Sequence, residues 1–176
     1  MKRGKRSKKG QFYLIAAMVI IALIIGFAVI SSSPKKTTPI KLYNLGQELG
    51  IESQNVLAYG TYNELNDSQM QTLWEQFVKE YANYTGEGKN LYFIFGNSVT
   101  ISVIAYQTLA ESALINVGTG YQPLIIGGTT TTFVPSGSTV TIKIGTETYS
   151  FNLATGQNFY FVISQTVSGE KYVVKS

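Results

Sequence analysis

The residues that carry most protein chemistry are sparse in this chain of 176 residues, which contains neither histidine nor cysteine. Without them, imidazole and thiolate metal ligands, cysteine nucleophiles, disulfides and every catalytic triad that uses histidine are excluded. Any chemistry of this chain must therefore come from its carboxylates, amides, hydroxyls and aromatic rings.

The ten acidic residues are spread along the chain, with no D-x-D run and no EF-hand loop. The closest grouping of oxygen ligands consists of Asn63, Glu64, Asn66 and Asp67. This group is either a calcium site or the capping turn of the helix that follows. Two carboxylates facing each other across a cleft could hydrolyse a glycoside, but spacing along the sequence does not show any two of them converging. We therefore predict that the chain is not an enzyme and has no catalytic, cofactor or metal site.

Two tripeptides match the acceptor pattern for N-glycosylation, Asn66-Asp67-Ser68 and Asn83-Tyr84-Thr85. They make Asn66 and Asn83 candidate glycosylation sites. Such sites are modified only on an exported chain, so they agree with the topology derived next.

The positive charge of the chain is concentrated at its start. Lysine and arginine number 14 against 10 acidic residues, and six of these bases lie within the first ten residues. Beyond residue 10 the chain carries eight bases and ten acids. The basic balance thus reflects one tail and not a basic patch on a folded surface, so we exclude nucleic acid as a partner.

A stretch of 19 residues from Phe12 to Ile30 contains no charge and no amide. As a helix it would measure roughly 28 Å, close to the hydrocarbon thickness of a bilayer. We predict a single transmembrane helix at residues 11–30. Six bases precede it and only Lys35 and Lys36 closely follow it, which places residues 1–10 in the cytoplasm and the C-terminal domain outside the cell.

Two other interpretations of this stretch are a cleaved secretory signal and a buried helix of a soluble protein. Secretory signals have apolar regions of about 7 to 15 residues, which is shorter than this stretch, and a small-x-small cleavage site. Only a Ser-x-Ser sequence follows it, at residues 31–33. The basic tail in front of the stretch argues against a soluble core helix.

The sequence Lys8-Lys9-Gly10-Gln11, directly before the apolar stretch, resembles the class III signal peptide of archaeal type IV pilin-like proteins. The resemblance covers about 20 residues. It implies cleavage by a prepilin-type peptidase between Gly10 and Gln11, and it implies a surface protein of the pilin-like class. In many members a glutamate at the fifth mature position helps to register the subunit, whereas this chain has Ile15 there. The alternative is that Lys8, Lys9 and Gly10 are the flank of a plain signal anchor.

Residues 31–39 are rich in serine, proline and lysine, a composition that predicts an extended linker. An extracytoplasmic domain then occupies residues 40–176. Its first part, residues 40–65, is ambiguous because leucines at helical spacing alternate with Gly46, Gly50 and Gly60, each unfavourable in a helix. We expect a short helix or turn there, followed by a strand near residues 56–59.

A second segment, at about residues 68–84, predicts an amphipathic helix. Its apolar stripe consists of Met70, Leu73, Trp74, Phe77, Val78 and Tyr81. Asp67 or Ser68 can cap its start, Ser68 and Gln71 have the spacing of a capping box, and Gly86 can end it. We expect the stripe to pack on a sheet; the alternative is a partner-binding helix.

From residue 91 onward the apolar period changes to two, which is typical of strands. Eight or so short strands are expected in residues 91–176, one of them at residues 124–126, with a two-residue hairpin turn at Gly145-Thr146 and another turn at Ser168-Gly169. The predicted fold class is a single transmembrane helix plus an α+β domain, in which one amphipathic helix precedes an antiparallel, β-sandwich-like sheet.

Three functions are compatible with these features. The first is a membrane-anchored extracytoplasmic structural or interaction protein, such as a pilin-like filament subunit that assembles with itself or contacts the envelope. The second is a bitopic accessory subunit whose anchor pairs with another membrane protein. The third is a membrane-tethered hydrolase.

The leader resemblance generates a processing prediction. N-terminal sequencing of the mature protein should begin at Gln11, and replacing Gly10 by valine should block the cut because the peptidase must fit a small residue before the bond. A wild-type protein that begins at Met1 or Lys2 would contradict the prediction and leave a plain signal anchor.

Overall fold

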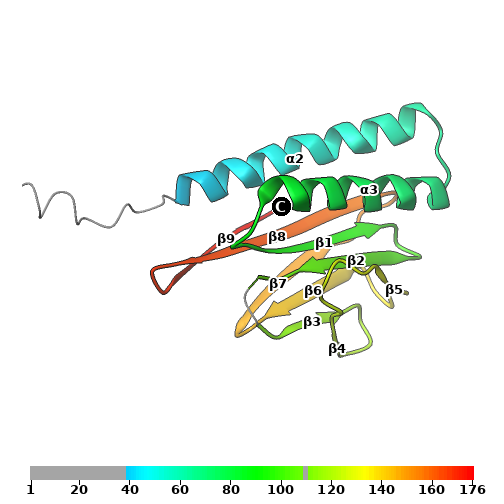
Figure 1. Cartoon of the computed structure of the whole chain (residues 1–176). Helices are drawn as coiled ribbons and strands as arrows, with labels where there is room; N and C mark the ends of the chain where they lie inside the picture. The colour runs from blue at the N-terminus through cyan, green and yellow to red at the C-terminus, as the bar shows by residue number, and fades with distance from the viewer. Residues whose placement is uncertain (1–38, 109–110) are drawn as a thin grey trace, which may run out of the picture. The chain divides into compact units, whose positions relative to one another are not determined.

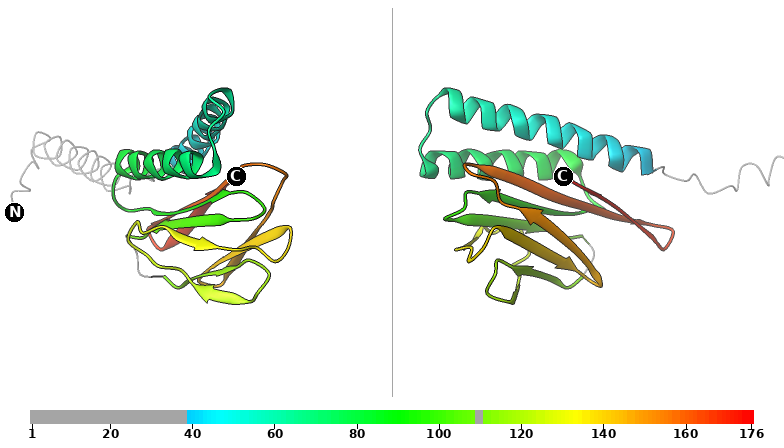
Figure 2. Two further views of the ribbon diagram at one scale, coloured as in Figure 1. Left: turned by 90° about the vertical axis from the view of Figure 1, so that its right-hand side faces the viewer. Right: turned by 180° about the vertical axis from the view of Figure 1, so that it is seen from behind.

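In the computed structural model, which describes residues 39–108 and 111–176, the chain folds into two helices and nine strands (Figure 1). The described helices are α2 (Pro39–Tyr62) and α3 (Asp67–Thr85). They lie side by side over one face of a sheet, as two views show (Figure 2). The predicted basic tail, transmembrane helix and most of the linker lie outside the described residues.

Helix α3 confirms the predicted amphipathic helix. The side chains of Met70, Trp74, Val78 and Tyr81 are buried against the sheet and α2, so the apolar stripe is core. Gly86, with a φ of 68°, follows its last turn as predicted.

The predicted start of α3 was wrong by one or two residues. The capping residue is Asn66, whose Oδ1 accepts a hydrogen bond from the Gln69 backbone N–H. Gln69 Oε1 in turn accepts from the Asn66 N–H, which completes a capping box. Asn66 and Gln69 have the same spacing as the predicted pair, Ser68 and Gln71. The prediction of a capping box was therefore correct, but the box lies two residues earlier in the sequence.

Helix α2 corrects the prediction for residues 40–65. It runs without interruption to Tyr62, so the strand expected near residues 56–59 does not form. Two of its glycines sit at close contacts: a Cβ at Gly46 would overlap the side chain of Val174, and one at Gly60 would overlap that of Met70. The cost of glycine within a helix is thus offset by packing that a larger residue would prevent.

The strands form two sheets in which every ladder is antiparallel. The first sheet has the order β5-β2-β1-β8-β9 and the second the order β4-β3-β6-β7. The strands are β1 (Asn90–Gly96), β2 (Ile101–Tyr106), β3 (Ala113–Asn116), β4 (Tyr121–Pro123), β5 (Thr131–Phe133), β6 (Thr139–Ile144), β7 (Glu147–Asn152), β8 (Asn158–Val167) and β9 (Glu170–Lys175). The α+β class with antiparallel sheets is therefore confirmed.

Local details of the strands are mostly as predicted. The two-residue turn at Gly145-Thr146 joins β6 to β7, and Ser168-Gly169 joins β8 to β9. The strand expected at residues 124–126 does not form. Strand β4 ends just before these residues, and Ile126 makes only an isolated bridge to Ala105.

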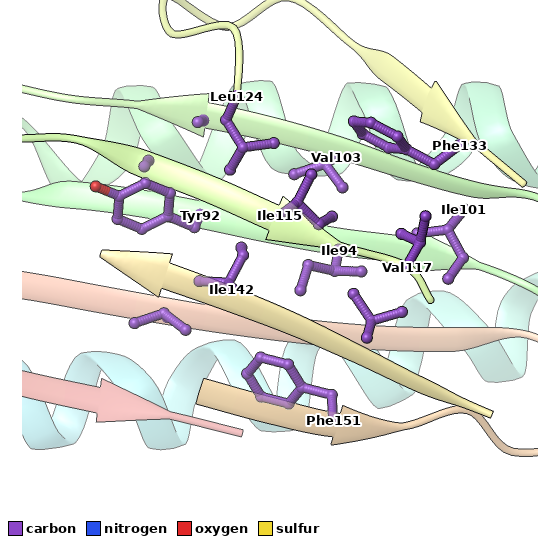
Figure 3. Close-up of a cluster of buried hydrophobic side chains, with 14 of the residues drawn as sticks. Tyr92, Ile94, Ile101, Val103, Ile115, Val117, Leu124, Phe133, Ile142 and Phe151 are labelled. Carbon is purple, nitrogen blue, oxygen red and sulfur yellow. The ribbon is translucent and has the colours of Figure 1, made fainter. Parts of the chain in front are cut away.

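Two apolar clusters hold the described layers together. One lies between the sheets and includes Tyr92, Ile94, Ile115 and Ile142 (Figure 3). The other lies between the helices and the first sheet and includes Trp74. We predicted one helix packed on a β-sandwich. The described residues instead form three layers, namely the pair of helices, a middle sheet and an outer sheet.

The glycines of α2 provide a matched pair of substitutions. Gly50→Ala should raise the free energy of unfolding by about 0.5 to 1 kcal/mol, because a Cβ there meets no neighbouring atom. Gly46→Ala should lower it, because the added Cβ collides with Val174. Urea unfolding of both variants tests this, and equal effects at the two positions would contradict it.

Candidate functional site

Helix α2 has one face that is used by the fold and one that is not. Leu42 and Leu49 are 2% and 0% exposed and belong to the cluster beneath the helices. The packing is against α3, β8 and β9. The opposite face carries several large side chains that the described fold leaves in solvent.

This second face presents a ridge along α2. Its members follow at steps of four residues, the spacing that aligns side chains along a helix surface: Tyr43, Gln47, Ile51, Asn55 and Tyr59. We call these five residues the α2 ridge. Tyr43, Ile51 and Tyr59 are 56%, 61% and 58% exposed. None of the five is charged, which is unusual for a helix face in contact with water.

An acidic groove lies between α2 and α3, close to the ridge in sequence. It encloses about 350 Å³ and is lined by Glu48 and Glu52 of α2 and by residues of α3. The α3 side consists of Phe77, Glu80, Tyr81 and Tyr84. Three carboxylates and three aromatic rings make this groove attractive to a cationic group.

The tyrosines of the acidic groove stay protonated at neutral pH. Burial, and then the charge of Glu48, raise the pKa of Tyr81, whose hydroxyl donates a 2.7 Å hydrogen bond to the Leu45 carbonyl. The charge of Glu48 is also the main cause that raises the pKa of Tyr84. The negative charge of the groove therefore comes from its carboxylates, and its rings stay neutral.

The candidate glycosylation residues occupy different places on α3. Asn66 is exposed, but its side chain is engaged as the cap of the helix. Asn83 is exposed on the last turn, while Thr85 of the same tripeptide is buried and donates to the Ala82 carbonyl. The candidate processing residues Gly10 and Gln11 lie outside the described residues.

Three side chains of the oxygen-rich turn at residues 63–67 form hydrogen bonds with different partners. Asn63 donates its side-chain amide to the Tyr59 carbonyl, Asn66 caps α3, and Asp67 accepts from Asn97 and Gln157. Within residues 39–108 and 111–176, no three acidic side chains gather into a group that could hold a metal. Asn66 of this turn has the capping role that the sequence left open beside a calcium site.

Sequence reasoning missed both the α2 ridge and the acidic groove. A signal for the ridge was present in the uncharged residues at four-residue steps from Tyr43 to Tyr59, but the glycines of the same segment obscured the helix.

In the part of the chain that the structure describes, neither helix has the length and apolar composition that a membrane crossing requires. No protein-family model matches the chain, and neither a curated protein nor a solved structure is significantly similar to it.

Buried tyrosines generate a prediction about alkaline stability. Burial, partly offset by the hydrogen bond from Gln107, raises the pKa of Tyr92 from 10.0 to about 12. Between these pH values the unfolded chain loses this proton and the folded chain keeps it, so stability present below pH 10 is lost as pH rises. Thermal unfolding followed from pH 9 to 12, roughly across the ordinary tyrosine pKa, should show this decline.

A pair of phenylalanine variants isolates the contribution of Tyr92. Tyr92→Phe should make the decline shallower above pH 10, whereas Tyr43→Phe, at a side chain 56% exposed, should not change it. Identical pH profiles for wild type and Tyr92→Phe would contradict the assignment.

Proposed function

We propose that this protein is a membrane-anchored, extracytoplasmic structural subunit of the pilin-like class, whose domain packs on a second copy through the α2 ridge. The observation that carries the proposal is the ridge itself. Tyrosine and isoleucine side chains more than half exposed, on a helix face without charges, are typical of a surface that is covered by a protein partner.

Charge complementarity supports a second copy as that partner. The acidic groove presents Glu48, Glu52 and Glu80, whereas in the sequence Lys35 and Lys36 shortly precede α2 and Lys41 is its third residue. In an assembly of identical chains, the lysines of one copy can meet the groove of its neighbour. Opposite charges of this kind set the register and rate of association.

The N-terminal resemblance supports the same class. Cleavage after Gly10 and an anchor at residues 11–30 would leave the domain outside the membrane. Because Ile15 stands where many filament subunits have a glutamate, contacts between the domains would have to supply the register that this glutamate provides. The α2 ridge is a surface suited to that task.

Cross-linking through an introduced cysteine tests this proposal in intact cells. The chain contains no cysteine, so a single Ile51→Cys substitution provides the only reactive thiol in it. A short bismaleimide should join two copies of the Ile51→Cys protein. Thr148→Cys, at an exposed residue of β7, is the matched control and should remain single.

A charge placed on the ridge gives an independent measurement. Ile51→Glu should abolish sedimentation of the protein as filaments while leaving its thermal unfolding unchanged, because Ile51 is outside the core. Cross-linking of Ile51→Cys to a protein of different mass would instead favour an accessory subunit of a membrane complex. Absence of any cross-link, with sedimentation unaffected by Ile51→Glu, would refute the proposal.

A further inference from the structure

Two tripeptides match the acceptor pattern for N-glycosylation, and the structure places them in different environments. Asn66-Asp67-Ser68 lies where the chain enters α3, whereas Asn83-Tyr84-Thr85 lies within the last turns of that helix. The pattern specifies an asparagine, whose amide receives the sugar, and a hydroxyl two residues later. A transferase that acts on a folded domain must reach both groups, and only the first tripeptide meets this condition.

Asn66 is exposed and keeps its amide nitrogen available, although the same residue caps α3. The capping box uses the side-chain Oδ1, which accepts from the Gln69 backbone N–H at 3.0 Å, and the Asn66 backbone N–H, which donates to Gln69 Oε1. Nδ2 takes part in no hydrogen bond with the described residues. A sugar attached to Nδ2 therefore leaves both bonds of the capping box in place.

The backbone and the hydroxyl of the same tripeptide are also accessible. Asn66 has a φ of −72° and a ψ of 169°, so its backbone is extended and not helical. Ser68 is exposed, and its Oγ has no hydrogen-bond partner in the part of the chain that the structure describes. The carboxylate of Asp67 accepts from Asn97 and Gln157, which fixes the turn against the rest of the domain.

Asn83 is exposed as well, but the hydroxyl that belongs to its tripeptide is not. All three residues of the tripeptide are helical, as part of α3. Thr85 is 8% exposed, and its Oγ1 donates a 3.0 Å hydrogen bond to the Ala82 carbonyl. A transferase reaches this hydroxyl only if the end of α3 unfolds, so the fold protects Asn83 from modification.

We propose that Asn66 is N-glycosylated on the folded domain and that Asn83 is not. The proposal rests on the extracytoplasmic location proposed above, because such sites are modified only on exported chains. In the reaction, Nδ2 of Asn66 attacks C1 of a saccharide carried on a lipid phosphate. The C1–N bond forms while the bond between C1 and the phosphate oxygen breaks. The lipid phosphate leaves with that electron pair, and the amide nitrogen gives one proton to a base of the transferase.

The position of Asn66 is compatible with assembly through the α2 ridge. Figure 1 shows the turn between α2 and α3 at the end of α2 that is opposite Pro39. Ile51 lies near the middle of the same helix. Modification at Asn66 and contact through Ile51 therefore involve different parts of the surface.

Mass spectrometry of the full chain purified from its native cells tests the proposal. Peptides that contain Asn66 should carry added mass that fragments as sugar residues, whereas peptides that contain Asn83 should not. Asn66→Asp removes the amide and keeps a capping oxygen, so it should abolish the added mass without lowering the thermal unfolding temperature. Asn83→Asp is the matched control and should keep the full added mass.

The hydroxyls give a second set of variants that does not touch the cap. Ser68→Ala should abolish the modification of Asn66, and Ser68→Thr, which restores a hydroxyl, should retain it. Thr85→Ala should leave the added mass unchanged. Unchanged modification in Ser68→Ala would contradict the assignment.

A separate measurement of location distinguishes failure of this proposal from failure of the proposed function. Thr148→Cys, at an exposed residue of β7, gives the chain its only thiol, and a membrane-impermeant maleimide should label it in intact cells. Unmodified Asn66 in a labelled protein would overturn this proposal alone. An unmodified protein that the maleimide does not label would overturn both. Sugar on Asn83, alone or together with Asn66, would show that the fold does not select the site and would overturn the assignment.

Discussion

The middle sheet must bury both of its faces, and the rest of the domain depends on that constraint. Strand β1 shows it most clearly: Leu91, Phe93 and Phe95 belong to the cluster beneath the helices, while Tyr92 and Ile94 belong to the cluster between the sheets. All five side chains are at most 2% exposed. Because a strand of this kind is stable only between two covering layers, the helix pair and the outer sheet are both required.

This constraint also positions the surfaces that we associate with function. Helix α2 uses one face to cover β8 and β9, and the ridge is what remains on its other side. The turn that carries Asn66 is tied to the middle sheet through Asp67, whose partners Asn97 and Gln157 directly follow β1 and directly precede β8. Both surfaces are therefore built on rigid elements of the core and not on long loops.

The two proposals use different chemistry. The α2 ridge is an exposed surface without charged side chains, and the carboxylates of the acidic groove attract lysine side chains. This combination is suited to a protein partner. Asn66 offers one amide nitrogen close to an exposed hydroxyl, which suits a transferase that attaches a sugar.

The sequence by itself determined the elements whose patterns are local. The apolar stripe of α3, its glycine stop, the two-residue turn at Gly145-Thr146 and the antiparallel strands all follow from spacing within a few residues. The anchor, its topology and the processing site rest on residues 1–38 and stay predictions. Only the tertiary structure decided the extent of α2, the number of layers and both candidate sites. Gly46 is tolerated because Val174 lies against it, and Asp67 is held by partners 30 and 90 residues away, contacts that no local pattern encodes.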